Sequence, residues 1–178
     1  MRRTEFPYGA FLLYSVEIDP CHMHRPEVVA GEVAVIGAAD GDGANAMTAS
    51  WGTVGVLWNK PVCICFIRPQ RYTFGLAEKN DRLSFSFFGK ERRDALAYCG
   101  KFSGRDGDKL KAAGLDYEMI DGTPVFNDAR LTLICRKLYA DDLKENKFID
   151  ENMLANYAAK DYHRFYVCEI EKVLAKEE

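Results

Sequence analysis

The chain has 178 residues, of which 48% are apolar and 29% are charged, and its formal net charge is −3. This balance is typical of a folded globular chain, and the length allows one domain over residues 1–178 to bury a core without disulfides or metals. The mild acidity speaks against a nucleic-acid partner, and without a long apolar run or a signal-peptide core we expect a cytoplasmic chain with no membrane partner.

The first half of the chain is predicted to consist of strands separated by tight turns. A β-rich run over Val28–Ala38 ends in Asp40-Gly-Asp-Gly43, whose glycines permit a positive φ. Strand-like runs follow at Met47–Thr53 and Pro61–Arg68. Thr73–Lys79 is predicted to form a short helix, with the Thr73 hydroxyl as its N-terminal cap.

The second half mixes strands with helices. Leu83–Phe87 alternates large apolar and small polar residues, as a half-buried strand does, and Glu91–Lys101 has the apolar stripe of a helix. The remaining predicted elements are helices at Asp108–Ala113 and Asp150–Lys160, and strands at Thr123–Phe126, Ala129–Asp141 and Arg164–Leu174. Many strands with few helices and no regular βαβ alternation predict a mainly β fold, an antiparallel barrel with helical additions. No Rossmann or P-loop motif is present.

The cysteines and histidines allow more than one interpretation. Cys63 and Cys65 lie two apart in a strand-like run, where buried thiols are favoured over a redox pair, because the C-x-x-C spacing is absent. Cys21-His-Met-His24 could be read as a metal site, but such sites usually draw ligands from separated positions. We therefore predict no metal and favour a terminal or subunit contact for this segment.

One segment, Asn45-Ala-Met-Thr-Ala-Ser-Trp-Gly52, places an amide, two hydroxyls, a thioether and an indole directly after a glycine-rich turn. In an extended chain, alternation sets two groups of residues on opposite faces: Met47, Ala49 and Trp51 against Thr48, Ser50 and Gly52. One face could then lie against a flat aromatic ligand while hydroxyls meet its polar edge. An ordinary strand with hydroxyls turned to solvent is the alternative.

Two further segments favour an anion. Arg68-Pro-Gln-Arg-Tyr-Thr73 places two guanidinium groups before a predicted helix N-terminus, a combination suited to phosphate, although solvated surface arginines fit equally well. Gly100-Lys-Phe-Ser-Gly-Arg-Asp-Gly-Asp-Lys109 could close a loop over a phosphate, but a plain turn between helices has the same composition.

Taken together in this order, the segments resemble the flavin reductase-like (flavoredoxin) family. The matching motifs are Asn45…Gly52, Trp58-Asn-Lys-Pro61 with Arg68…Thr73, the S-G-x-x-x-D-K loop at Ser103…Lys109, and Asp161-Tyr-His163. The resemblance covers Val28 to Leu174 and leaves residues 1–26 as an unmatched N-terminal extension. It implies an FMN-binding split β-barrel of antiparallel, Greek-key type, usually paired as a homodimer with FMN near the interface.

The resemblance also implies which residues bind FMN. Met47, Thr48, Ala49, Ser50 and Trp51, with Asn45 before them, would border the isoalloxazine ring. The residues implied at the ribityl and phosphate end are Arg68, Arg71, Tyr72 and Thr73, with Ser103 and Lys109 reaching the phosphate or the ring edge. His163 would lie near the flavin, either as a proton donor or ring contact, or as a packed interface histidine.

The implied function is that of an FMN-dependent oxidoreductase. In this interpretation the chain is an NAD(P)H:flavin (or acceptor) reductase with no catalytic residue in the strict sense, because FMN brings the redox chemistry. A flavoredoxin-type carrier, which exchanges electrons with a redox protein through tightly bound FMN, is one alternative. A non-enzymatic flavin-binding module is another.

Overall fold

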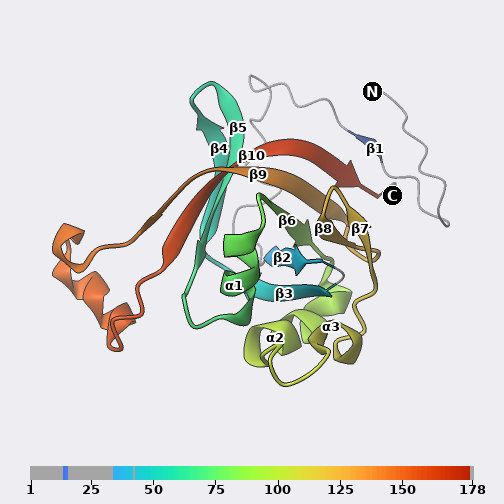
Figure 1. Ribbon diagram of the computed structural model, residues 1–178, viewed down its shortest axis with the longest axis horizontal. Coiled ribbons are helices and arrows are strands. Elements are labelled where there is room, and N and C mark those ends of the chain that lie inside the picture. The colour runs from blue at the N-terminus through green and yellow to red at the C-terminus, as the bar shows by residue number, and fades with distance from the viewer. Residues whose placement is uncertain (1–13, 16–33, 42, 177–178) are drawn as a thin grey trace.

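The computed structural model describes residues 14–15, 34–41 and 43–176. Within these residues eight strands form one antiparallel sheet, in the order β3-β2-β6-β9-β10-β5-β4, with β1 also paired to β10 (Figure 1). In chain order these strands are β1 (Tyr14–Ser15), β2 (Ala34–Asp40), β3 (Gly43–Ala49), β4 (Gly52–Leu57), β5 (Lys60–Ile67), β6 (Arg82–Phe87), β9 (Leu131–Asp142) and β10 (Arg164–Ala175). A separate hairpin pairs β7 (Tyr117–Ile120) with β8 (Thr123–Phe126).

Helices cover parts of this sheet. They are α1 (Tyr72–Lys79), α2 (Arg93–Lys101) and α3 (Lys109–Ala112), with 3-10 helices η2 (Lys90–Arg92), η3 (Glu145–Lys147) and η4 (Glu151–Tyr157). In Figure 1, α2 and α3 lie beneath β3, where Cys99 and Leu110 pack in one cluster with Val35 and Ala46. The β4–β5 hairpin and the arm (residues 143–163, between β9 and β10) project from the barrel in different directions.

The sheet is curled into a barrel. Its terminal strands β3 and β4 follow each other in the chain and are joined only by Ser50 and Trp51, so the two ends of the strand order must meet. Met47 of β3 accordingly shares one core with Cys63 and Cys65 of β5 and with Tyr166 of β10. The predicted mainly β antiparallel barrel with helical additions is confirmed.

Several predicted elements change at their ends. The run Met47–Thr53 is not one strand, because the chain crosses between the two ends of the strand order at Ser50 and Trp51. Gly52 then allows β4 to approach β5 closely, since a Cβ there would lie 2.7 Å from the Ile64 carbonyl oxygen. The predicted helix Asp150–Lys160 is the 3-10 helix η4, which the Asp150 carboxylate caps at the Asn152 N–H.

Other differences concern turns and caps. The Thr73 cap is wrong: α1 begins at Tyr72, so the cap position falls on Arg71, whose side chain makes no capping hydrogen bond. The Thr73 hydroxyl lies inside the helix and accepts a hydrogen bond from Asn45. Strand β7 was not predicted, although Asp121-Gly122, both at positive φ, is a typical two-residue hairpin turn. The predicted turn between β2 and β3 is confirmed, with Gly41 at φ +60°.

The cysteines of the described residues are buried and free. Cys63 and Cys65 are among them, which confirms that this pair consists of packed thiols. Burial raises the pKa of both, and that of the Cys168 thiol to about 12. Within residues 14–15, 34–41 and 43–176, no group of three His, Cys, Asp or Glu side chains could hold a metal ion. Cys21–His24 and the extension 1–26, apart from β1, lie outside the described residues. No helix of the described chain is long and apolar enough to cross a membrane.

Candidate functional site

A cavity of about 260 Å³ opens at the C-terminal end of β3. Its walls come from β3 and the connection to β4, the end of β5, the turn before α1, the C-terminal end of α2 and the last residue of the arm. The lining residues are Met47, Thr48, Ala49, Ser50, Trp51, Phe66, Arg68, Arg71, Gly100 and His163. Apolar and aromatic walls with a few polar groups are typical of a small-molecule site.

Most of the predicted site residues therefore meet in one cavity. The predicted residues outside its lining are Asn45, Tyr72, Thr73, Ser103 and Lys109. Phe66 and Gly100 line the cavity but were not predicted. Phe66 could have been found, because it alternates in β5 with the buried Cys65 and Ile67 and so points away from the barrel core. Gly100 carries no comparable signal, since only the packing of α2 on β3 brings it there.

The first segment reaches the cavity by a different geometry from the one predicted. Met47 is buried in the core, and the Thr48 hydroxyl donates to the Leu96 carbonyl at 2.5 Å, which ties β3 to α2. Ser50 and Trp51 lie outside both strands, so strand alternation does not set their direction. Trp51 stays 48% exposed, and its ring centroid lies 5.0 Å from that of His163.

Direct contacts join the three predicted segments, residues 45–52, 68–73 and 100–109, to one another. Asn45 Nδ2 donates to Thr73 Oγ1 at 2.7 Å, and both residues are buried. Gly104 approaches so closely that a Cβ there would lie 2.7 Å from the Tyr72 ring and would also clash with the Asn45 amide. Arg105 donates to the Gln70 carbonyl at 3.0 Å. Of the predicted residues outside the lining, Asn45, Tyr72 and Thr73 thus connect the segments that form the cavity walls.

This close approach makes Gly104 sensitive to substitution. We expect Gly104→Ala to destabilise the fold by about 1–3 kcal/mol, as overpacking typically does. Gly75→Ala is the matched control, because nothing lies within 4 Å of a Cβ at that helical position and alanine favours the helix. Thermal unfolding checks both variants, and a Gly104→Ala protein as stable as the unmodified chain would contradict the packing described above.

A cationic region lies at the C-terminal end of α2. Arg71 donates to the Gly100 carbonyl at 3.0 Å, and Lys109 Nζ donates to the Cys99 carbonyl at 3.2 Å. Lys109 is only 5% exposed; burial lowers its pKa, and the nearby Arg71 charge acts in the same direction. Among the described residues neither cation is paired with a carboxylate. Two cations compensated only by helix-end carbonyls form a region that favours an anion.

Arg68 is held differently. It donates to the Asp161 carboxylate at 2.5 Å and to the Asn156 carbonyl at 2.9 Å, and Gln70 also donates to Asp161. These hydrogen bonds, that of Arg68 first, lower the pKa of Asp161. The second carboxylate oxygen, Oδ1, is buried without a hydrogen-bond partner among the described residues. The Arg68 charge is therefore paired with the Asp161 carboxylate, whereas Oδ1 of that carboxylate lacks a hydrogen-bond donor among the described residues.

His163 closes the cavity beside Trp51. It is 7% exposed, its Nδ1 lies 2.9 Å from the Tyr157 hydroxyl, and its ring meets the edge of Phe66 at 6.4 Å between centroids. Burial, with the Arg68 charge as a second cause, lowers the pKa of His163 to about 4. The imidazole is therefore neutral at neutral pH.

Comparison with known proteins adds a family and a fold. Residues 23–178 match the family model described as Flavin reductase like domain. Among solved structures, the FMN-binding domain of a flavin reductases-like enzyme from Shewanella baltica is similar with TM-score 0.71 and 16% identity, over 95% of this chain and 80% of that one. Flavoredoxin from Methanosarcina acetivorans gives TM-score 0.64 and 24% identity, over 82% and 69% of the two chains. A split barrel domain protein from Shewanella frigidimarina gives TM-score 0.66 and 18% identity, over 83% and 68%. No curated protein matches significantly. The structural similarities establish the split-barrel fold.

Proposed function

The chain belongs to the flavin reductase-like domain family, and on this premise we propose that it binds FMN in the described cavity and acts as an FMN-dependent oxidoreductase. In this proposal the donor is NAD(P)H and the acceptor is a free flavin or another small oxidant. The observation that carries it is that residues of three sequence segments line or adjoin one cavity, which has aromatic side chains in its walls and two cations, Arg71 and Lys109, that no carboxylate of the described residues pairs with.

The residues present fit FMN group by group. Trp51 and Phe66 offer aromatic surface to a flat ring, and the mostly buried Met47 borders the cavity beside them. Arg71 and Lys109 offer charge to a phosphate, and a phosphate there would give these cations the anion that the protein does not supply. The description of similar solved proteins as FMN-binding supports this choice of cofactor.

The roles of the remaining predicted residues follow from their contacts. Because Arg68 is paired with Asp161, we propose Arg71 as the main phosphate contact and Arg68 as a residue that fixes the arm against the end of β5. Ser103 and Thr73 stay predicted as hydroxyls near the phosphate end. Lys109 does not line the cavity, but its Nζ donates to the Cys99 carbonyl, next to the Gly100 carbonyl that Arg71 binds. We therefore propose that Lys109 acts at the phosphate and not at the ring edge.

Bound FMN would supply hydride acceptance and electron transfer. The protein side chains bind, orient and exclude water. No hydroxyl that lines the cavity is paired with a general base among the described residues: the Thr48 hydroxyl donates to a backbone carbonyl, and the Ser50 hydroxyl has no hydrogen-bond partner among them. No cysteine lines the cavity. We therefore propose that no side chain acts as a nucleophile.

The function is tested by spectroscopy and steady-state kinetics. The protein incubated with FMN should retain a flavin spectrum after gel filtration and should oxidise NADH or NADPH with free FMN or a ferric chelate as acceptor. Reversible reduction of bound FMN without NAD(P)H turnover would instead support an electron carrier that works with a redox protein. A chain that takes up no FMN would overturn both.

We further propose a homodimer with FMN near the interface. Two observations support the homodimer. Large apolar side chains are exposed on the β4–β5 hairpin, at Val56 and Trp58, and on the arm, at Ile149 and Met153. In addition, the 260 Å³ cavity is smaller than most cofactor sites. A second copy could cover the part of FMN that the cavity leaves outside. Light scattering should give twice the mass of the chain, and a monomer at micromolar concentration would refute the proposal.

A further inference from the structure

Tyr157 and His163 form a buried pair at the edge of the cavity. Tyr157 lies at the end of η4 and is 6% exposed, and its hydroxyl lies 2.9 Å from Nδ1 of His163. Of the two residues only His163 lines the cavity. The second ring nitrogen of His163, Nε2, has no hydrogen-bond partner among the described residues.

The hydrogen in this contact belongs to Tyr157. Burial raises the pKa of Tyr157, so the phenol keeps its hydrogen, and the described residues offer that hydrogen no other acceptor than Nδ1. If Nδ1 carried the ring hydrogen and donated it to the phenol oxygen, the buried phenol hydrogen would have no acceptor, which costs free energy. Tyr157 therefore donates, Nδ1 accepts, and the hydrogen of the neutral ring is on Nε2.

The surroundings hold Tyr157 in place and keep His163 neutral. Arg68 lies over the Tyr157 ring at 5.3 Å and also donates to the neighbouring Asn156 carbonyl. The ring of Tyr162 packs at a tilt against that of Tyr157, with 5.0 Å between the ring centroids. The charged groups that face His163 are Arg68, which disfavours a second positive charge, and Asp161, whose opposite effect is weakened by its pairing with Arg68.

We propose that Tyr157 is a positioning residue that fixes His163 as a neutral Nε2–H hydrogen-bond donor toward the cavity. The cavity then offers a hydrogen at this point and cannot accept one. It selects flat ligands that present an acceptor, such as a ring carbonyl oxygen or an unprotonated ring nitrogen, and disfavours ligands that present an N–H there. Only the identity of the ligand as a flavin rests on the proposed function; the donor itself does not.

The test is the side-chain nitrogen spectrum of ¹⁵N-histidine-labelled full-length protein without flavin. The chain has three histidines, and His163→Gln identifies the His163 signals by their loss. We expect a single neutral Nε2–H form of His163 at pH 7 in the unmodified chain. A predominant Nδ1–H form of His163 in the unmodified chain would overturn the proposal.

Tyr157→Phe removes the donor and keeps the ring. We expect a mixture of both neutral forms in this variant, because nothing else among the described residues distinguishes the two nitrogens. Tyr162→Phe, which changes the adjacent tyrosine, is the matched control and should leave the Nε2–H form intact. An unchanged His163 spectrum in Tyr157→Phe would mean that the pair is only packed and would overturn the positioning role.

A second measurement adds flavin. In Tyr157→Phe we expect FMN and riboflavin to lose affinity by the same factor, of about 3-fold to 10-fold, as for one hydrogen bond that is made less often. Loss for FMN alone would contradict a contact to the ring. A chain that shows the Nε2–H form but binds neither flavin would refute the proposed function and leave the donor assignment standing.

Discussion

Replacing Arg71 by methionine is expected to lower the affinity for FMN about 10-fold to 100-fold, as for the loss of a charge-assisted hydrogen bond, and to leave riboflavin nearly unchanged. Arg71 lines the cavity and donates to the Gly100 carbonyl, but no carboxylate among the described residues neutralises it. Riboflavin lacks the phosphate, so the difference between the two ligands isolates that contact. Fluorescence titration of each flavin measures both affinities.

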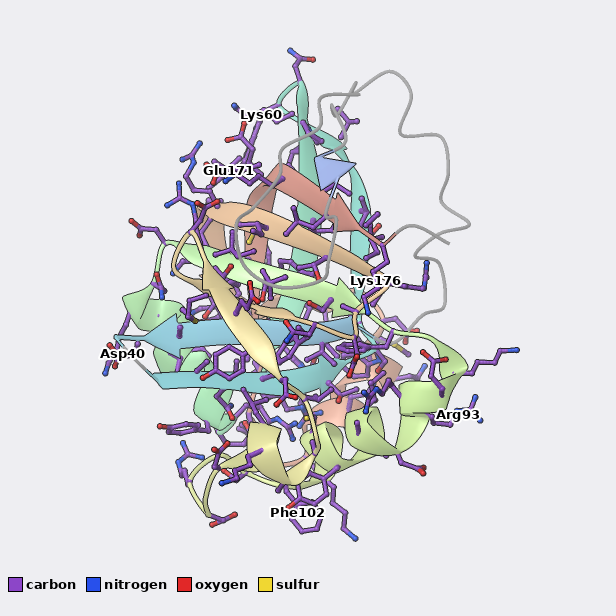
Figure 2. The ribbon with its side chains drawn as sticks, turned by 90° about the vertical axis from the view of Figure 1, so that its right-hand side faces the viewer. Asp40, Lys60, Arg93, Phe102, Glu171 and Lys176 are labelled. Atoms are coloured by element: carbon purple, nitrogen blue, oxygen red, sulfur yellow. The ribbon has the colours of Figure 1, made fainter. Side chains whose placement is uncertain are left out.

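The control for this substitution is Arg93→Gln. Arg93 is exposed at the beginning of α2, away from Phe102, which follows the cavity end of the same helix (Figure 2). The substitution Arg93→Gln removes one positive charge without changing the cavity. It should change FMN affinity little, because exposed charges are screened. Equal losses of FMN and riboflavin in Arg71→Met would refute the phosphate assignment.

Lys109 adds a pH dependence to the same preference. Burial lowers the pKa of Lys109, and a bound phosphate would favour its charged form and raise that pKa again. Above about pH 7, where a phosphate monoester is mostly dianionic, FMN affinity should therefore fall as pH rises through the lowered pKa of Lys109. Riboflavin affinity should not follow this trend, and Lys109→Met should abolish the trend for FMN.

Trp51→Ala is expected to weaken FMN and riboflavin alike, about 10-fold, because stacking of an aromatic side chain on a ligand ring does not depend on the phosphate. Trp51 lies beside His163 on the cavity wall and is 48% exposed, so its indole has one free side for a ligand. The fluorescence of the bound flavin should rise in the variant, since a stacked indole quenches it.

Trp51→Phe is the conservative control for this prediction. It keeps an aromatic ring and should retain most of the affinity, and the exposure of Trp51 means that neither substitution should lower the unfolding temperature by much. Unchanged binding of both flavins by Trp51→Ala would place the ring elsewhere.

Local sequence patterns were sufficient to predict several elements and one motif of the candidate site. The strands β5, β6 and β10 and the helix α2 were predicted close to their observed positions, because the residue pattern of each segment indicates its type by itself. The half-buried character predicted for β6 was wrong, because Ser84 and Ser86 are buried as well and are hydrogen-bonded to the Pro124 carbonyl and the Thr132 hydroxyl. The motif around Met47 and Trp51 was likewise found from residue chemistry and family resemblance, and the structure places it at the cavity.

What the sequence alone could not decide depends on contacts between distant segments. The family resemblance implied that Arg68 and Arg71 lie together at the ribityl and phosphate end. It gave no sign that Arg68 is paired with Asp161, ninety-three positions away, or that Arg71 donates to the Gly100 carbonyl at the end of α2. The Thr73 hydroxyl serves Asn45 rather than its own helix for the same reason. A hydrogen-bonding side chain takes whichever partner the fold brings nearest, and local propensity contains no information about that partner.

The sequence by itself therefore determined the family, the antiparallel β character and the residue types of the site. Only the tertiary structure decided that Ser50 and Trp51 connect the two ends of a curled sheet. The same is true of the close contact of Gly104 with Asn45 and Tyr72 and of the hydrogen bond between Tyr157 and His163. The physical reason is that strand periodicity fixes which face a side chain takes, whereas closure of the barrel fixes which faces meet.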